Sequence, residues 1–224
     1  MKFRFKNRQE AGIELAKKLK DSVILSTQGV RRISRVDPSL TLRMTTVLLA
    51  LPRGVVSIAS SIAKVLNIDF NIYISKKIPH PDNEEFAIGA MGEFGEMVID
   101  PFFSNLITSK TIKETKNKIE SYIKQYRKKP IENLDSKTVI LVDDGIATGL
   151  SMEAAIKDIQ KLHPKKIIVA VPVIAEDTFE KLNKTVPVIA LIVSSDPFFS
   201  VGMYYEDFHQ LSDQEVEKII SNEQ

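Results

Sequence analysis

Two adjacent carboxylates and a glycine-rich turn stand together in segment 139–151. Four apolar residues precede Asp143 and Asp144, as in a buried strand that ends at the carboxylates. Glycines let a backbone curl so that successive N–H groups point inward, and a following helix presents its positive end, which together suit a phosphate dianion. The turn contains two glycines and two hydroxyl donors, which are Gly145, Gly149, Thr148 and Ser151. The segment therefore predicts a phosphate site beside a pair of acids.

The acidic pair restricts the kind of phosphate ligand. Carboxylates beside a phosphate would repel it unless they faced another part of the ligand, such as sugar hydroxyls or a metal-bound edge. A ribose 5-phosphate meets both demands. A Walker A loop would need a lysine after its glycines, and no G-x-G-x-x-G follows a predicted strand, so the sequence argues against a kinase or a dehydrogenase. The alternative is an ordinary strand-to-helix turn with capping aspartates.

The elements that would position this segment alternate between strands and helices. Apolar runs predict strands at 47–51, 70–75, 138–142, 167–173 and 186–193. Helical spacing predicts helices at 7–20, 58–66, 104–128, 150–162 and 177–182, and Asn7 is the expected N-cap of the first. Residues 76–85, with two prolines, predict an exposed loop. The alternation predicts an α/β fold, a doubly wound, mostly parallel sheet flanked by helices, with ligands at the carboxyl ends of the strands.

Length and composition fit one cytoplasmic domain. The chain has 224 residues, of which 43% are hydrophobic, enough for one substantial core. It has no cysteine, which excludes a disulfide, a zinc–thiolate site and a cysteine nucleophile and agrees with a reducing interior. No apolar run approaches the roughly 20 residues that span a bilayer. We therefore expect no membrane segment.

Positive charge is concentrated near the N-terminus. Residues 1–46 contain 11 Lys+Arg and 4 Asp+Glu, a surplus of 7, whereas the remainder contains 20 and 25, a deficit of 5. A solvated basic face explains this surplus better than binding to nucleic acid or an acidic partner. The arginines concerned are Arg31, Arg32, Arg35 and Arg43. Segment 21–46 has no clear secondary-structure pattern.

Segment 139–151 resembles the signature with which type I phosphoribosyltransferases bind 5-phosphoribosyl-1-pyrophosphate (PRPP). That signature has four apolar residues, two acidic residues and a loop that closes with Thr-Gly-x-Ser/Thr. The resemblance implies that Asp143 and Asp144 approach the 2- and 3-hydroxyls of the ribose. It also implies a 5-phosphate loop whose ligand-binding residues are Gly145, Ile146, Ala147, Thr148, Gly149, Leu150 and Ser151. Segments 5–12, 51–54, 86–90 and 199–208 are similar to a group of phosphoribosyltransferases with unassigned acceptors.

The same resemblance implies a pyrophosphate loop at Pro52, Arg53 and Gly54. A basic residue and exposed amides of this loop hold the leaving group in the family, and Arg53 could do so with two parallel hydrogen bonds. Members of the family often have a cis peptide here. Because a cis bond is least costly before proline, Leu51–Pro52 is its expected position.

Two further segments are assigned by resemblance. Residues 76–85 match the mobile catalytic loop that covers PRPP, where Lys76 or Lys77 would meet the pyrophosphate. Phe199 matches a residue that stacks on the base in 6-oxopurine enzymes, although a hydrophobic lid explains the nearby aromatic residues about equally well. Those enzymes usually have an acid at the position of Ala147, where adenine-type enzymes have alanine. The acceptor therefore stays open.

The resemblance implies transfer of the 5-phosphoribosyl group of PRPP to a nitrogenous acceptor, with a purine base as one candidate, and release of pyrophosphate. Mg²⁺ would be bound mainly through PRPP rather than by a metal site of the protein. One domain, 1–224, is expected, with hood elements from 1–46, 96–130 and 194–224, and a homodimer is one expected assembly. The alternative is a PRPP-sensing regulator without catalysis that binds nucleic acid.

Overall fold

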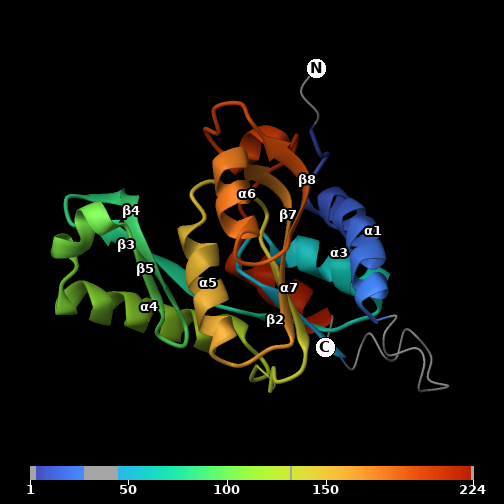
Figure 1. Ribbon diagram of the computed structural model, residues 1–224, viewed down its shortest axis with the longest axis horizontal. Helices are drawn as coiled ribbons and strands as arrows, with labels where there is room; N and C mark the ends of the chain where they lie inside the picture. The colour runs from blue at the N-terminus through green and yellow to red at the C-terminus, as the bar shows by residue number, and fades with distance from the viewer. Residues whose placement is uncertain (1–3, 28–44, 132, 223–224) are drawn as a thin grey trace.

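A five-stranded parallel sheet forms the centre of the computed structural model, which describes residues 4–27, 45–131 and 133–222. The strand order is β2–β1–β6–β7–β8, and all neighbouring pairs are parallel (Figure 1). The strands are β1 (Thr46–Ala50), β2 (Phe70–Ile72), β6 (Thr138–Val142), β7 (Lys166–Ala175) and β8 (Val188–Ser194). The predicted fold class is confirmed, and each of the five predicted strands occurs, although β2 is three residues shorter than expected.

Helices cover both faces of this sheet. Successive strand residues point to opposite faces, so Leu48 packs in one layer and Leu49 in the other. The first layer contains α1 (Arg8–Thr27), α3 (Val56–Leu66) and α7 (Asp213–Asn222), and the second contains α5 (Leu150–Gln160) and α6 (Glu176–Asn183). Asn7 caps α1 as predicted, because its Oδ1 accepts a hydrogen bond from the Glu10 N–H at 3.0 Å. Within the described ranges, no helix has the length and apolarity to cross a membrane.

A second sheet, antiparallel, replaces the exposed loop predicted at 76–85. Ile78 and Ile88 are fully buried on neighbouring strands of this sheet, and only residues 81–82 form the turn between them. Pro79 fits at a register shift on an edge strand, where proline is tolerated. The loop prediction is wrong because Pro79 lies within β3 and Pro81 stands in a short turn rather than in a long loop. The strands are β3 (Ser75–His80), β4 (Asn83–Gly92) and β5 (Met97–Ile99).

The remaining segments surround the two sheets. The 3-10 helix η1 (Pro101–Leu106) and the helix α4 (Ser109–Tyr126) follow the small sheet, and η2 (Val201–Tyr204) follows β8. Of the predicted hood segments, 96–130 lies beside the small sheet, whereas α1 packs on α3 and residues 194–222 run from β8 to α7. The hood stays a prediction. Residues 28–44, which include Arg31, Arg32, Arg35 and Arg43, lie outside the described residues.

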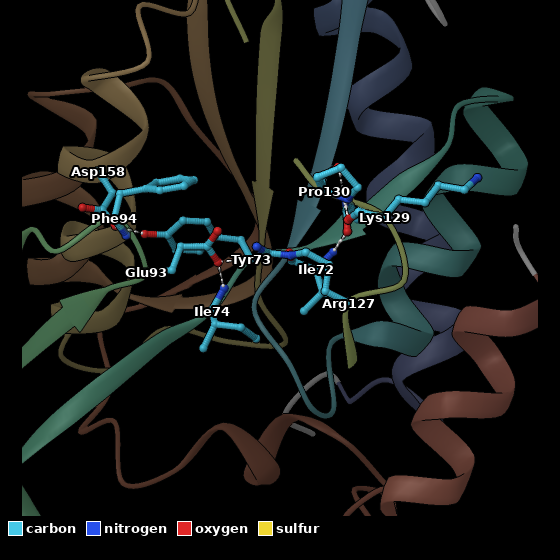
Figure 2. A network of polar contacts seen from close by, with 10 residues as sticks. Ile72, Tyr73, Ile74, Glu93, Phe94, Arg127, Lys129, Pro130 and Asp158 are labelled. Atoms are coloured by element: carbon cyan, nitrogen blue, oxygen red, sulfur yellow. Dashed lines mark hydrogen bonds and ion pairs between the residues drawn. The ribbon is translucent and has the colours of Figure 1, made fainter. Parts of the chain in front are cut away.

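A buried carboxylate anchors the small sheet to α5 (Figure 2). Asp158 is completely buried and accepts a hydrogen bond from the Tyr73 hydroxyl at 2.7 Å. It also accepts from the N–H groups of Phe94 and Glu96, in the turn between β4 and β5, each at 2.7 Å. Three donors therefore satisfy one charge, which makes its burial tolerable.

An ion pair lies next to this anchor in Figure 2. Arg127 pairs with Glu93, and its Nη2 donates to the Ile72 carbonyl at the end of β2 at 2.8 Å. Burial raises the pKa of Glu93, and the hydrogen bond and charge of Arg127 oppose that shift. Together, the hydrogen bonds of Asp158 and the Arg127–Glu93 ion pair fix the small sheet relative to the central sheet. They thereby also fix the two lysines of β3.

Candidate functional site

Neighbouring parallel strands bring two loops together at one edge of the central sheet. β1 pairs with β6 so that Ala50 lies opposite Val142. The loops that follow are joined directly, because the Leu51 N–H donates to the Val142 carbonyl at 3.1 Å. The carboxyl ends of parallel strands are the usual ligand site in an open α/β sheet. The topology therefore places the predicted pyrophosphate loop beside the predicted 5-phosphate loop.

The loop after β6 forms a backbone cradle. The Ile146 N–H donates to the Val173 carbonyl at 2.9 Å, and the Ile146 carbonyl accepts from the Ala175 N–H at 3.0 Å. Gly149 has a φ of 76°, a conformation that favours glycine, and the first amides of α5 after it have no partner inside the helix. All seven predicted loop residues, 145–151, line a cavity of about 140 Å³. This arrangement suits an anion.

The two carboxylates have different surroundings. Asp143 lines the cavity, and its Oδ1 accepts from the Asp144 N–H at 2.8 Å. Burial, and then the charge of Asp144, raise the pKa of Asp143 well above its usual range. Asp144 instead pairs with Arg8, with Nε and Oδ2 2.8 Å apart, and this pair opposes the rise that burial causes in the pKa of Asp144. Asp143 is therefore the acid that faces the cavity.

Arg8 is a site residue that the sequence did not predict. Its Nη1 donates to the His209 carbonyl at 2.8 Å, and its guanidinium carbon lies 3.7 Å from the centre of the Phe208 ring. The sequence does contain a signal that marks Arg8, because this residue lies on the same helix face as the apolar, buried Ala11 and Leu15. A charge on a buried face needs a partner.

The predicted pyrophosphate loop contains a cis peptide bond between Pro52 and Arg53. The sequence predicts the cis bond at Leu51–Pro52, where proline makes the cis form least costly, so this position is corrected by one residue. Arg53 is partly exposed, and its Nη1 donates to Oδ1 of Asp213 at 3.2 Å. This hydrogen bond raises the pKa of Arg53. Arg53 therefore belongs to a loop that adjoins the cradle, and its side chain is held by a carboxylate at the start of α7.

The two predicted lysines are neighbours on β3. Lys77 lines the cavity with Asp143. Lys76 has its ammonium over the Tyr122 ring, 3.1 Å from the centroid. Burial, followed by the charges of Arg53 and Lys118, lowers the pKa of Lys76 to about 8. Because neighbouring strand residues point to opposite faces, one lysine reaches the acidic pair and the other reaches the surroundings of Arg53.

Phe199, the predicted stacking residue, lies between β8 and η2 and is 80% exposed. Its neighbour Phe198 stacks on Tyr204, with ring centroids 5.4 Å apart, whereas Tyr204 and Tyr205 are buried. The buried rings pack in a core cluster with Phe5 and Val173. Phe199 differs from them because its ring stays accessible.

Known proteins resemble this chain in sequence and in fold. A family model described as "Phosphoribosyl transferase domain" matches residues 28–207. The Mycobacterium tuberculosis H37Rv protein named "Putative phosphoribosyl transferase Rv0571c" is 29% identical over 180 residues, 76% of this chain and 40% of that protein. The chain thus spans less than half the length of that relative. The crystal structure of TT1426 from Thermus thermophilus has 32% identity, 99% coverage of both chains and a TM-score of 0.73.

Proposed function

Because this chain belongs to the phosphoribosyl transferase domain family, we propose that it transfers the 5-phosphoribosyl group of PRPP to a nitrogenous acceptor and releases pyrophosphate. The observation that supports this most is the meeting of three features at the ends of β1 and β6. They are the backbone cradle, the acidic pair and Arg53. A cradle alone would suit many phosphates. A sugar with phosphate at one end and pyrophosphate at the other matches all three features.

Each part of the site would hold one part of PRPP. Within 145–151, the amides other than the Ile146 N–H, together with the Thr148 and Ser151 hydroxyls, would bind the 5-phosphate. Asp143 and Asp144 orient the ribose hydroxyls, and their charge favours the positive charge that develops at C1 as its bond to pyrophosphate breaks. The acceptor nitrogen forms the new bond to C1 from the opposite side, with inversion. Its proton leaves to solvent.

Cationic side chains would stabilise the departing pyrophosphate. Arg53 can donate two parallel hydrogen bonds to phosphate oxygens once the ligand replaces Asp213 as its partner. Lys76 and Lys77 add positive charge from β3. Mg²⁺ carried by PRPP would neutralise part of the pyrophosphate charge. In the part of the chain that the structure describes, no group of three or more His, Asp or Glu side chains could hold a metal ion by itself.

The acceptor would bind near the segment after β8. The exposed ring of Phe199 is suited to stacking on a heterocyclic base. Ala147, from the cradle, lines a cavity of about 520 Å³ together with Phe198 and Asp196 of this segment. The identity of the acceptor, a cytoplasmic location and a homodimer stay predictions from the sequence.

A pyrophosphate-release assay tests the proposal. The protein is incubated with PRPP, Mg²⁺ and a panel of purines, pyrimidines, amines and amides, and release should exceed PRPP hydrolysis for at least one acceptor. Asp143→Asn should lower that excess by about 100-fold, whereas Asp135→Asn, at an exposed aspartate away from the cradle, should keep it. PRPP binding without release for any acceptor would overturn transfer and favour the regulator, for which salt-sensitive binding to nucleic acid is the check.

A further inference from the structure

Arg8 is one of the few charged residues buried in the described part of the chain, with 8% of its surface exposed. A buried guanidinium costs several kcal/mol unless charges and hydrogen bonds compensate it. The compensation comes from three directions, which are the Asp144 carboxylate, the His209 carbonyl and the face of the Phe208 ring. Two of these partners belong to the C-terminal segment and one to the acidic pair. Arg8 therefore connects the N-terminal helix to the centre of the site.

The Arg8–Asp144 pair also supports the pyrophosphate loop. A Cβ built on Gly54 would lie 2.6 Å from Nε and Nη2 of Arg8 and 2.6 Å from Oδ2 of Asp144. The loop backbone therefore rests directly on the ion pair, and only glycine allows this approach. On the other side, the Tyr205 hydroxyl donates to the Asp144 carbonyl at 2.6 Å. The ion pair lies between the two loops that would hold opposite ends of PRPP.

We propose that Arg8 is a positioning residue for the transfer reaction, which keeps the Asp144 carboxylate ionised and fixed against Gly54. This inference rests on the proposed function. Arg8 would touch neither PRPP nor the acceptor. It acts through Asp144, whose charge and place determine the spacing between the acidic pair and the pyrophosphate loop.

The charged groups around Asp144 make this role measurable. Burial favours the neutral form of Asp144, whereas the charge and the hydrogen bond of Arg8 favour its ionised form. The charge of Lys77 acts on Asp143, whose raised pKa it opposes, and the Tyr205 hydroxyl contacts the backbone carbonyl of Asp144. Removal of Arg8 should therefore let Asp144 take up a proton at a higher pH than in the wild type.

The first measurement follows the pH profile of pyrophosphate release. Arg8→Gln should lower kcat about tenfold or more at pH 7. It should also shift the acid limb of the pH profile, where the rate falls as Asp144 is protonated, to a pH about 1 unit higher. Arg8→Lys should recover part of the rate, because it keeps the charge and loses the fork. The double variant Arg8→Gln/Asp144→Asn should lack the displaced limb, since no carboxylate is left at position 144 to titrate.

The matched control is Arg127→Gln. Arg127 and Arg8 are equally buried, with side chains 11% and 10% exposed, and each pairs with a carboxylate. Arg127→Gln should lower thermal stability and leave the acid limb where it is. A uniform loss of rate at all pH values in folded Arg8→Gln, with no displaced limb, would show a merely structural role and overturn the proposal.

A second measurement does not depend on turnover. In protein with ¹³C-labelled aspartate carboxyl groups, the Asp144 resonance is assigned by its loss in Asp144→Asn and followed from pH 3 to pH 8. It should titrate about 1 pH unit higher in Arg8→Gln than in the wild type. An unchanged titration would overturn the role of Arg8 even if the enzyme is active. If the protein shows the expected titration shift but releases no pyrophosphate with any acceptor, only the proposed function is refuted.

Discussion

Two arginine–carboxylate pairs, whose arginines are about equally buried, lie in different parts of the molecule. Arg8–Asp144 lies at the ends of β1 and β6, beside a cavity lined by backbone amides and Asp143. Arg127–Glu93 lies between the small sheet and the end of β2, next to the satisfied carboxylate of Asp158. A buried charge alone therefore does not mark a functional site. The first pair borders open space that is suited to an anion, whereas the second joins two sheets.

The largest expected effect tests the second region. In Asp158→Asn, the amide group that replaces one carboxylate oxygen places a donor against an N–H or hydroxyl that now donates to Asp158. The free energy of unfolding, measured by urea denaturation, should fall by about 3 kcal/mol. Asp135→Asn, at an exposed position, should change it by less than about 0.5 kcal/mol. Equal stability of Asp158→Asn and wild type would contradict the anchoring role.

Asp143→Asn tests the first region and should lower pyrophosphate release by about 100-fold. Although its activity falls, the stability of Asp143→Asn should stay the same or rise. Because the pKa of Asp143 is raised in the folded state, this group makes the wild type less stable as pH rises from about 4 through the folded pKa. The variant should lack that loss and be at least as stable as wild type at pH 7, as denaturation at several pH values would show. If Asp143→Asn were strongly destabilised, Asp143 would have a structural role like that of Asp158.

Arg53 tests the cationic half of the first region. Arg53→Lys keeps the charge and loses the fork of donors, and Arg53→Ala loses both. In calorimetry with Mg²⁺-PRPP, affinity should fall in the order wild type, Lys, Ala, with a loss of about tenfold for Ala. Ribose 5-phosphate, which lacks pyrophosphate, serves as the control ligand and should bind the three proteins similarly. Equal weakening toward both ligands would remove Arg53 from the site.

Lys76 should have a smaller effect that depends on pH. With its pKa lowered to about 8, this ammonium loses its charge as pH rises through 8. Affinity for Mg²⁺-PRPP should therefore decline about fivefold between pH 7 and pH 9 in the wild type, and Lys76→Met should lack this part of the decline. Lys110→Met removes a lysine whose side chain is 84% exposed on α4, and it should behave like the wild type. If the affinity of Lys76→Met for Mg²⁺-PRPP declined by the same factor, a group other than Lys76 would cause the pH dependence.

The elements recognised correctly from the sequence are those whose signal is local. β6 carries a continuous apolar run because it is buried on both faces, and the glycines that follow it mark the loop. The hairpin of β3 and β4 escapes prediction because two prolines in a short segment resemble a loop. What allows a strand there is its position at the edge of a sheet, which no local pattern reveals.

The polar partners of the site depend on contacts between distant parts of the chain. Arg8 and Asp144 are 136 residues apart, and Tyr73 and Asp158 are 85 apart. The sequence shows that a charge stands on a buried helix face, but not which carboxylate neutralises it. The acidic pair could be predicted as a unit. Its division into an acid that faces the cavity and an acid paired with arginine follows only from the fold.

The pairing of Phe5 with residues 204–206 has a consequence for biosynthesis. The Phe5 N–H donates to the Tyr204 carbonyl at 2.9 Å, and the Phe5 carbonyl accepts from the Glu206 N–H at 2.8 Å. A ribosome adds about 5–20 residues per second, so some 200 residues separate these partners by on the order of 10–40 s of synthesis. Arg8 therefore emerges long before the segment that completes its surroundings. The nascent chain can form the cradle after β6 well before it can complete the surroundings of the ion pair that supports the pyrophosphate loop.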